Sequence, residues 1–362
     1  MKKHLLKIVL LSLMAFTYYS CVQEPANPDD NPITEGKKVL LVLNEGLFNM
    51  NNSTITYFNY DDSTAVTDYF AEKNSRGLGD TGNDMKLHGG KIYIAVTTSS
   101  LVEIMDAKTG VSLRQIPMFD DTKPRQPRYV CCYKDKAFVS CFDGNVAVID
   151  TLTLQVEQYI KVGANPDGLI AVNDYLFVAN SGGLNNPNYD STVSVINLQN
   201  YQEIKKITVA INPYIIVPDK YGDLYVVTRG NYGNIPYQLH IVNSATLERT
   251  HTFADISILN MCINDDNDIA YAYSYDFNTG KGNVITFNVR TEQLVSNNFI
   301  SDNTKIKTLY GIAIDEETGD VYISDANDFT NTGFVYCFDK DGKQKFNFPA
   351  GLNPTKMVFM KN

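Results

Sequence analysis

The sequence predicts an all-β fold, a seven-bladed β-propeller whose four-stranded blades occupy residues 38–362. Three observations lead to this prediction. A short strand that ends in Asp or Asn recurs seven times, a second strand recurs in the same rhythm, and the first unit lacks a strand that the C-terminal residues can supply. Four strands in a unit of about 46 residues, repeated along one chain, are typical of propellers.

The first repeated strand alternates in character and closes on Asp or Asn, as in "VAVID" and "VITFN". Asp and Asn suit this position because their side chains bond the backbone two residues on and so begin a turn. The gaps between successive closing residues are 47, 44, 47, 46, 45 and 51 residues. The closing residues are Asn59, Asp106, Asp150, Asn197, Asn243, Asn288 and Asp339.

The second repeated run is short, rich in β-branched and aromatic residues and bounded by turn residues, which identifies it as a strand. Another apolar run, such as "GLIAV", precedes most copies. Each unit therefore holds an inner strand, this second strand, the strand that closes on Asp or Asn, and an outer strand. The second strands are expected at residues 39–44, 91–96, 136–141, 175–180, 223–228, 268–273 and 320–325.

The two ends of the repeat predict how the ring closes. The first unit begins directly with its second strand, "VLLVLN", and the chain ends on "TKMVFMKN", an inner strand with no unit after it. We therefore expect the C-terminal strand to join the first blade. Closure of this kind removes open sheet edges that would invite aggregation.

A proline corner recurs in "GANPDGLIAV", "AINPYIIVPD" and "GLNPTKMVFM". Successive corner prolines in these stretches are 47 and 141 residues apart, and 141 is three times 47, so the gaps are whole numbers of blades. Proline favours extended backbone for itself and for the residue before it, which predicts a strand entrance. The corner prolines are Pro127, Pro166, Pro213 and Pro354. The neighbours expected to border the mouth of the channel are Asn165, Asp167, Asn212 and Tyr214.

The N-terminal residues predict a lipoprotein. Residues 1–20 have a basic start and an apolar run too short for a typical spanning helix, as in a secretory signal peptide. The run ends at "TYYSC", which resembles a bacterial lipobox and predicts lipidation of Cys21. Residues 21–37 are rich in Pro, Asn and Asp and predict a disordered tether. The acidic residues soon after Cys21 resemble the export signal of Bacteroides-type surface lipoproteins, and this resemblance implies an outer-membrane protein, lipid-anchored and facing the cell exterior. The alternative is ordinary secretion with a free Cys21.

Composition limits the partners. The formal net charge of -10 argues against general nucleic-acid binding, because neutralising phosphates requires clustered Lys and Arg. The five later cysteines show no zinc spacing and lie in apolar strand-like runs, where a free Cys behaves as a small hydrophobe. A disulfide that uses Cys141 stays open. Scattered histidines and the lack of a nucleophile motif predict no intrinsic cofactor, no metal and no catalytic residues.

The loops between the second and third strands carry the strongest functional signal. Blades 2 and 3 have minimal loops there, whereas the other blades have long loops rich in Asn, Gly, Tyr and Phe, which a repeat scaffold does not need. Binding and mere surface decoration both stay open. The ligand-binding candidates, on these loops or at nearby corners, are Phe48, Arg125, Asn180, Asn186, Tyr189, Tyr214, Arg229, Asn231, Tyr232, Tyr237, Tyr275, Asp276, Phe277, Asn327 and Phe329.

Polar residues at the ends of the second strands are expected to ring the channel. Two of them, Glu45 and Asp325, are carboxylates that could do acid/base or metal work, as in propeller lactonases. A solvated channel mouth explains the same residues without chemistry.

The lipobox, the acidic tether and the seven-fold repeat with "NP" corners resemble the BtuG-type surface lipoproteins of Bacteroidetes, which are YncE-like propellers. The resemblance implies that the chain captures cobalamin (vitamin B12) or a related corrinoid and delivers it to a TonB-dependent outer-membrane transporter of the BtuB type. Side chains of Asn, Asp and Tyr can pair with the amides that fringe a corrinoid, and aromatic faces can cover its apolar edge. The alternatives are a binding module for another nutrient or a protein partner, and a metal-dependent propeller lactonase or hydrolase.

Overall fold

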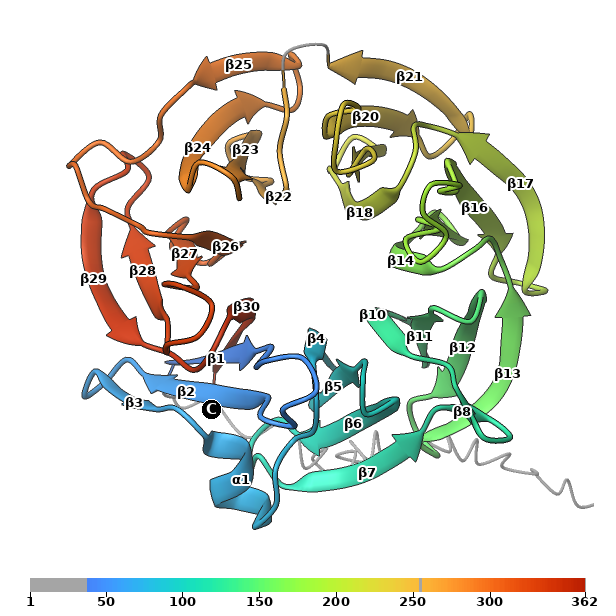
Figure 1. The fold of residues 1–362 in the computed structure, drawn as a ribbon, viewed down its shortest axis with the longest axis horizontal. Coiled ribbons are helices and arrows are strands. Elements are labelled where there is room, and N and C mark those ends of the chain that lie inside the picture. Colours follow the sequence, from blue (N-terminus) through green and yellow to red (C-terminus); the bar gives the residue numbers. More distant parts are fainter. Residues whose placement is uncertain (1–37, 254–255, 362) are drawn as a thin grey trace, which may run out of the picture. The chain divides into compact units, whose positions relative to one another are not determined.

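A computed structural model describes residues 38–253 and 256–361. These residues form seven four-stranded antiparallel sheets arranged as blades around a central axis, with two further strands in a small hairpin (Figure 1). The predicted signal peptide, Cys21 and the tether, residues 1–37, lie outside the described residues. The described residues contain no helix long and apolar enough to cross a bilayer.

Every blade uses the same strand order, from an inner strand at the channel to an outer strand at the rim. The inner strands are β30 (Pro354–Lys361), β4 (Gly82–His88), β10 (Pro127–Tyr133), β14 (Pro166–Val172), β18 (Pro213–Pro218), β22 (Asn260–Asn264) and β26 (Leu309–Ile314). The second strands are β1 (Lys38–Asn44), β5 (Lys91–Val96), β11 (Lys136–Cys141), β15 (Tyr175–Asn180), β19 (Asp223–Thr228), β23 (Ile269–Asp276) and β27 (Val321–Asp325). The third strands are β2 (Thr54–Asn59), β6 (Leu101–Asp106), β12 (Asn145–Asp150), β16 (Thr192–Asn197), β20 (Gln238–Asn243), β24 (Lys281–Asn288) and β28 (Phe334–Phe338). The outer strands are β3 (Thr64–Val66), β7 (Ser112–Pro117), β13 (Gln155–Lys161), β17 (Gln202–Thr208), β21 (Glu248–Phe253), β25 (Gln293–Ser296) and β29 (Gln344–Pro349).

The C-terminal strand closes the ring as predicted. Strand β30 pairs with β1 from Lys38↔Lys361 to Asn44↔Pro354, so the first blade is built from both ends of the repeat. The side chain of Asn44 reinforces the joint, because its Oδ1 accepts a 3.0 Å hydrogen bond from the backbone N–H of Gly351. Its Nδ2 donates to the hydroxyls of Thr54 and Thr56 at 3.0 and 2.9 Å.

The closing Asp and Asn residues do what the sequence predicts. The Oδ1 atoms of Asn197 and Asp339, for example, accept hydrogen bonds of 2.8 and 2.9 Å from the backbone N–H groups two residues on. Equivalent bonds occur at the ends of β2, β12, β20 and β24. At Asp106 the acceptor reaches three residues on, to the backbone N–H of Thr109. These side chains therefore set the turn between the third and outer strands.

The proline corners do begin the inner strands, but one part of the prediction is wrong. The residue before the proline is not extended: Asn165, Asn212 and Asn353 have φ of 42°, 61° and 55°, in the left-handed region. Asn tolerates this region better than most residues because its short polar side chain can bond locally. Each of the three side chains donates to a backbone carbonyl, of Phe142, Gly230 and Gly46 respectively. The "NP" pair is therefore a left-handed turn followed by a strand start.

One helix was not predicted from the sequence pattern. Helix α1 (Tyr69–Asn74) lies at the rim between β2 and β7, in the connection from the first blade to the second (Figure 1). The segment is fastened by Arg76, whose guanidinium bonds the fully buried carboxylate of Glu103 at 3.0 and 2.9 Å. The following "GLGDTG", residues 77–82, is held by Asp80, which accepts from the backbone N–H groups of Asn49 and Asn51. A two-strand hairpin, β8 (Phe119–Asp120) with β9 (Lys123–Pro124), occupies the next connection.

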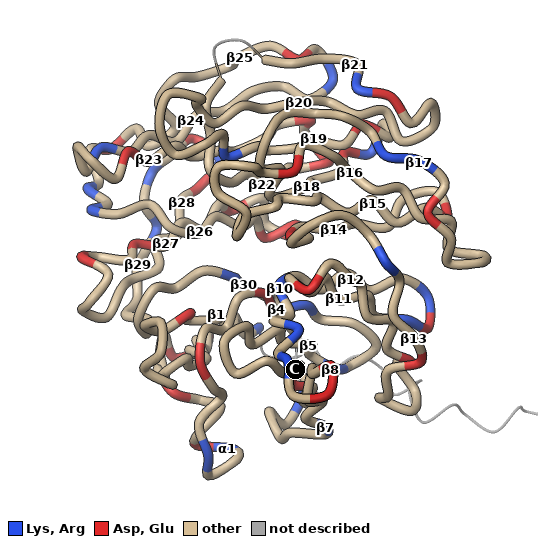
Figure 2. Tube along the Cα trace, turned by 45° about the vertical axis from the view of Figure 1, so that its right-hand side comes forward, with Lys and Arg blue, Asp and Glu red and all other residues tan. Residues whose placement is uncertain are grey.

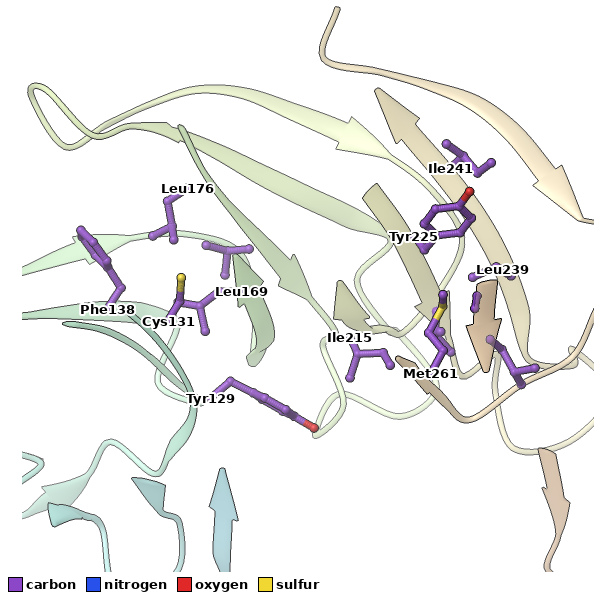
Figure 3. Close-up of a cluster of buried hydrophobic side chains, with 14 of the residues drawn as sticks. Tyr129, Cys131, Phe138, Leu169, Leu176, Ile215, Tyr225, Leu239, Ile241 and Met261 are labelled. Carbon is purple, nitrogen blue, oxygen red and sulfur yellow. The ribbon is translucent and has the colours of Figure 1, made fainter. Parts of the chain in front are cut away.

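The core lies within and between the blades. Figure 3 shows one cluster, in which Cys131, Phe138, Leu169 and Leu176 come from adjacent blades and are all buried. The close approach of neighbouring inner strands demands a small residue at Gly168, where a Cβ atom would meet the carbonyl oxygen of Tyr214 at 2.6 Å. Basic and acidic residues are interspersed around the described chain (Figure 2).

The five cysteines of the described residues are free, as expected for cysteines that act as small hydrophobic side chains. Cys141 is a buried free thiol, and Cys131, Cys132, Cys262 and Cys337 are also free. Burial raises the pKa of these thiols, to about 11 for Cys131 and about 12 for Cys337. They therefore stay protonated and act as small apolar side chains.

Candidate functional site

A cavity of about 450 Å³ lies at the loop-bearing mouth of the central channel. Its wall combines aromatic rings, amides and three charged groups. It is lined by Glu45, Asn83, Arg128, Tyr214, Arg229, Tyr232, Tyr237, Leu259, Asn260, Tyr273, Phe277, Leu309, Tyr310, Phe329 and Thr355. The volume falls within the range of about 300–1,000 Å³ that is usual for small-molecule pockets.

Bulges at the strand entrances supply much of this wall. In β4, β18, β26 and β30 the pairing with the second strand skips one residue directly after the strand begins, which is the mark of a β-bulge. The skipped residues are Asn83, Tyr214, Tyr310 and Thr355. All four line the cavity, and Arg128 holds the same position in β10, where the skip covers two residues. The bulge frees these residues from the ladder and directs their side chains inward.

The corners also fix the residues that follow the second strands. The backbone N–H of Arg229 donates to the carbonyl of Asn212 at 2.8 Å, and that of Glu45 donates to the carbonyl of Asn353 at 2.9 Å. Both carbonyls belong to the left-handed residue that precedes a corner proline. One repeated element therefore places two kinds of side chain at the cavity: the residue after the proline and the residue after the second strand.

The basic side of the cavity is built on a cluster of charged side chains that come from three successive blades. The Nε of Arg128 donates to Oδ1 of Asp167 at 2.9 Å, and Nη1 of Arg229 lies 3.8 Å from Oδ2 of the same carboxylate. The Asp167 side chain is 1% exposed. The guanidinium of Arg229 stacks on Tyr214, with its carbon 3.2 Å from the ring centroid. The nearby acidic and phenolic groups keep the pKa of both arginines raised despite burial, so both stay charged.

The acidic side lies at the first and last blades. The hydroxyl of Tyr310 donates to the carboxylate of Glu45, and the hydroxyl of Tyr273 donates to the carbonyl of Tyr310. Burial, followed by the neighbouring Glu45 carboxylate, raises the pKa of Tyr310 well above its ordinary value. These hydroxyls are therefore fixed donors, and the second oxygen of Glu45 can accept from a ligand.

Two strings of aromatic side chains flank the opening. On one side Tyr232 makes edge contacts with Tyr189 and Tyr237, with ring centroids 6.2 and 6.4 Å apart. On the other side Phe277 stacks with Phe329 at 6.2 Å, and Phe329 meets the edge of Tyr310 at 5.9 Å. Tyr232 and Phe277 are each 58% exposed. The rim thus presents apolar ring surface to whatever enters.

The structure brings six of the candidate residues together in this wall: Tyr214, Arg229, Tyr232, Tyr237, Phe277 and Phe329. Two more, Tyr189 and Tyr275, support the rim through ring contacts with Tyr232 and Phe277. Asn231 shapes its own loop by accepting from the backbone N–H groups of Gly233 and Ile235.

Other candidates lie away from the wall. Asn180 is fully buried and repeats the role of Asn44, since its Oδ1 accepts from the N–H of Gly163 and its Nδ2 donates to Thr192 and Ser194. It is buried and does not line the cavity.

Arg125 also lies away from this wall. It pairs with Asp143 and Asp120 and stacks on Tyr159, with its guanidinium carbon 4.0 Å from the ring centroid. None of these residues lines the cavity.

The long loops also contain candidates that do not reach the wall. Asp276 caps the tip of the β23–β24 hairpin. This hairpin is longer than expected, because β23 extends to Asp276 and β24 begins at Lys281. The Oδ1 atom of Asn327 accepts a 2.9 Å hydrogen bond from the ammonium group of Lys307. Phe48 and Asn186 are exposed on their loops, and neither lines the cavity.

The suggested carboxylate pair does not form a site. Asp325 is buried, and its two oxygens accept from the backbone N–H groups of Lys307, Thr308 and Asn327. Glu45 lines the cavity without it. Within the described residues no group of three or more His, Cys, Asp or Glu could hold a metal ion.

Sequence reasoning missed the inner-strand contributors. They are the second residues of four inner strands, Asn83, Arg128, Tyr310 and Thr355, and the first residue of β22, Asn260. For Arg128 and Thr355 the corner could have supplied the signal, because each directly follows a corner proline and is skipped by the ladder. Asn83, Asn260 and Tyr310 follow no proline and have no such signal in the sequence. Tyr214 and Asp167 follow an "NP" pair and were named from the sequence, whereas Thr355 follows the same pair and was not.

Comparisons with known proteins add the family and the fold. Residues 38–359 match the family model described as a domain of unknown function, DUF5074. No curated protein matches the chain. A quinoprotein alcohol dehydrogenase-like protein from Bacteroides thetaiotaomicron superposes with a TM-score of 0.68 at 15% identity, covering 91% of this chain and 79% of that one. A Bacteroides fragilis protein provisionally described as a 6-phosphogluconolactonase gives a TM-score of 0.66 at 13% identity, covering 92% and 100%. Hydrazine synthase of Kuenenia stuttgartiensis gives 0.64 at 14% identity, covering 78% and 95%.

At these identities the structural likeness supports the propeller fold alone. The family match spans almost the whole described region, from the first strand into the last. The chain therefore belongs to the DUF5074 family, whose domain in this protein is a seven-bladed β-propeller.

Proposed function

We propose that the chain is a lipid-anchored outer-membrane protein that binds cobalamin or a related corrinoid at the mouth of the propeller and delivers it to a TonB-dependent transporter. The observation that carries the proposal is the cavity at the channel mouth, where aromatic rings surround a wall of amide, hydroxyl and charged groups. The lipobox resemblance at Cys21 and the resemblance to BtuG-type lipoproteins support the location and the ligand class.

The groups in the wall suit a ligand fringed with amides. Glu45 offers an acceptor for amide N–H groups, Arg229 offers donors for amide carbonyls, and Asn83 and Asn260 offer both. Tyr232 and Phe277 expose ring faces that can cover the apolar edge of a corrin. A disc-shaped ligand would lie across the opening and send one substituent into the cavity. The rigid scaffold reduces the ordering cost of such capture.

A protein partner is favoured by a separate observation. Phe48, Met50 and Leu184 are 72%, 62% and 64% exposed on the long loops, and none of them lines the cavity. Exposed large apolar side chains near a binding site are typical of protein–protein contacts. We assign these loops to the transporter contact, which leaves the cavity to the ligand.

A thermal-shift panel on a soluble protein of residues 38–362 tests the ligand class, since the propeller closes within this range. The panel contains cyanocobalamin, dicyanocobinamide, neutral and acidic glycans, and a set of lactones. A rise in melting temperature with the corrinoids alone supports the proposal. A rise with a glycan alone replaces the ligand class, and turnover of a lactone would reinstate the enzymatic alternative.

The transporter contact is tested with Phe48→Ser and Met50→Ser in the full-length lipoprotein. The expected result is unchanged ligand binding by the soluble protein together with reduced corrinoid uptake by cells. Unchanged uptake would remove these loops from the proposed contact.

A further inference from the structure

We infer that the basic side of the cavity is an oxyanion subsite, in which Arg128 and Arg229 bind a phosphate or carboxylate group of the ligand. The inference deepens the proposed function by naming the chemistry of one part of the ligand. Its first test does not depend on the corrinoid proposal, and only its second test does.

The guanidinium group of Arg229 has N–H donors that no described residue uses. Its guanidinium has five N–H donors and is 21% exposed, yet it makes no hydrogen bond to any of the described residues. Its contacts are the face of Tyr214 and the oxygen of Asp167, 3.8 Å away. Stacking on a ring fixes the plane of the guanidinium and leaves the N–H edge available. Among the described residues, no Arg229 nitrogen is both buried and without a partner, so these donors reach the cavity and are available to a ligand.

The cluster of Arg128, Asp167 and Arg229 is positively charged. Two guanidinium groups, Arg128 and Arg229, share one carboxylate, Asp167, so the cluster carries one net positive charge. Asp167 bonds only Nε of Arg128, and the Nη groups of Arg128 make no hydrogen bond to the described residues. The Oδ2 atom of Asp167 is buried and without a hydrogen bond, so the carboxylate has capacity to hold both arginines in place.

The position of the charged side chains around the cavity also favours an anionic group at the arginines. Both arginines line the cavity, whereas Asp167 is buried and does not. Glu45, the carboxylate in the wall, belongs to the first blade and is bonded by Tyr310. An anionic group can therefore approach the arginines from the cavity without first meeting Asp167. A planar fork of N–H groups matches the oxygens of carboxylate and phosphate, which arginine binds in bidentate fashion.

Phosphate and carboxylate share this chemistry and are separated by experiment. In a corrinoid the candidate group is the phosphodiester of the nucleotide loop, which cobalamin contains and cobinamide lacks. In another ligand it would be a free carboxylate or phosphate monoester.

The first test is a thermal-shift titration of the soluble propeller with inorganic phosphate, pyrophosphate and citrate, against sodium chloride at matched ionic strength. We expect stabilisation of the native protein that is lost in Arg229→Gln and reduced in Arg229→Lys, which keeps the charge without the fork. Arg125→Gln is the matched control, because Arg125 is also ion-paired and stacked on a tyrosine but lies outside the cavity. Equal shifts in all four proteins, or none with any anion, would overturn the subsite.

The second test compares cobalamin with cobinamide by calorimetry. Arg229→Gln is expected to weaken cobalamin binding by about ten- to a hundredfold and to leave cobinamide binding unchanged. Equal losses for the two corrinoids would overturn the assignment to the phosphodiester. If neither corrinoid binds the native protein, the proposed function fails while the anion titration still decides the subsite. Circular dichroism and melting of each variant confirm that it is folded, and Arg229→Lys replaces Arg229→Gln if the latter is not.

Discussion

Arg128 Nε lies 2.9 Å from Asp167 Oδ1, and the two residues hold the same position in successive blades, directly after a corner proline. The pair joins β10 to β14 across the blade interface, and both side chains are largely buried. Removing one partner of a buried ion pair leaves a charge uncompensated. Asp167→Asn should therefore lower the free energy of unfolding by about 3 kcal/mol, measured by urea denaturation. Asp276→Asn, at an exposed hairpin tip, is the control and should change it by less than about 0.5 kcal/mol.

The buried asparagines that end β1 and β15 should contribute to stability and not to binding. Asn44→Ala and Asn180→Ala each leave the buried N–H of a glycine, Gly351 or Gly163, without its acceptor. We expect each substitution to cost about 2 kcal/mol in unfolding free energy. Ligand affinity measured on the folded Asn180→Ala protein should be that of the native protein. A selective loss of affinity in this variant would return Asn180 to the site.

Stability should fall as the pH drops below about 6.5, in part through one histidine. Burial lowers the pKa of His240 from 6.5 to about 4, and its ring nitrogens lie 2.8 and 3.4 Å from the hydroxyls of Thr252 and Thr228. The unfolded chain takes up a proton at this residue near pH 6.5, whereas the folded protein does so only near pH 4. The contribution is complete above pH 6.5 and is lost between the two values, by up to roughly 1.4 kcal/mol per pH unit. Urea denaturation at several pH values should show a shallower slope in this window for His240→Gln than for the exposed control His251→Gln. Identical slopes would contradict the assignment.

The aromatic rim should act in binding without acting in folding. Tyr232 and Phe277 are each 58% exposed, so their replacement by Ala should change the melting temperature little. Each substitution should weaken corrinoid binding by about tenfold, because aromatic anchors dominate binding energies. Tyr221→Ala is the matched control: Tyr221 is 46% exposed and lies in the turn between β18 and β19, and it does not line the cavity. An equal loss in the control would show that the rim has no particular role.

Much of the fold could be predicted from the sequence because the repeat reports the same local physics seven times. The second strands at 91–96, 136–141, 175–180 and 223–228 have the bounds that were predicted, and the closing Asp and Asn residues start the turns. Helix α1 escaped because six residues capped by Asp68 are too few to show helical periodicity.

The candidate site was predicted less completely, for a geometric reason. Loop aromatics such as Tyr232 and Phe277 stand out by composition, whereas Arg128 and Tyr310 reach the cavity through a skipped position in the sheet ladder. A bulge leaves no mark on the hydrophobic pattern unless a landmark such as proline fixes the register, and β26 begins with Leu309 instead. Asn180 is buried and does not line the cavity, because a polar residue at a strand end can face either the channel or the interior.

The measurement that tests the account most directly is a calorimetric titration of cyanocobalamin into the soluble propeller of residues 38–362. We predict saturable binding with a stoichiometry of about one ligand per chain, weakened in parallel by Tyr232→Ala and Arg229→Gln and unaffected by Arg125→Gln. The absence of heat and of a thermal shift at micromolar ligand, with the protein folded, would contradict it.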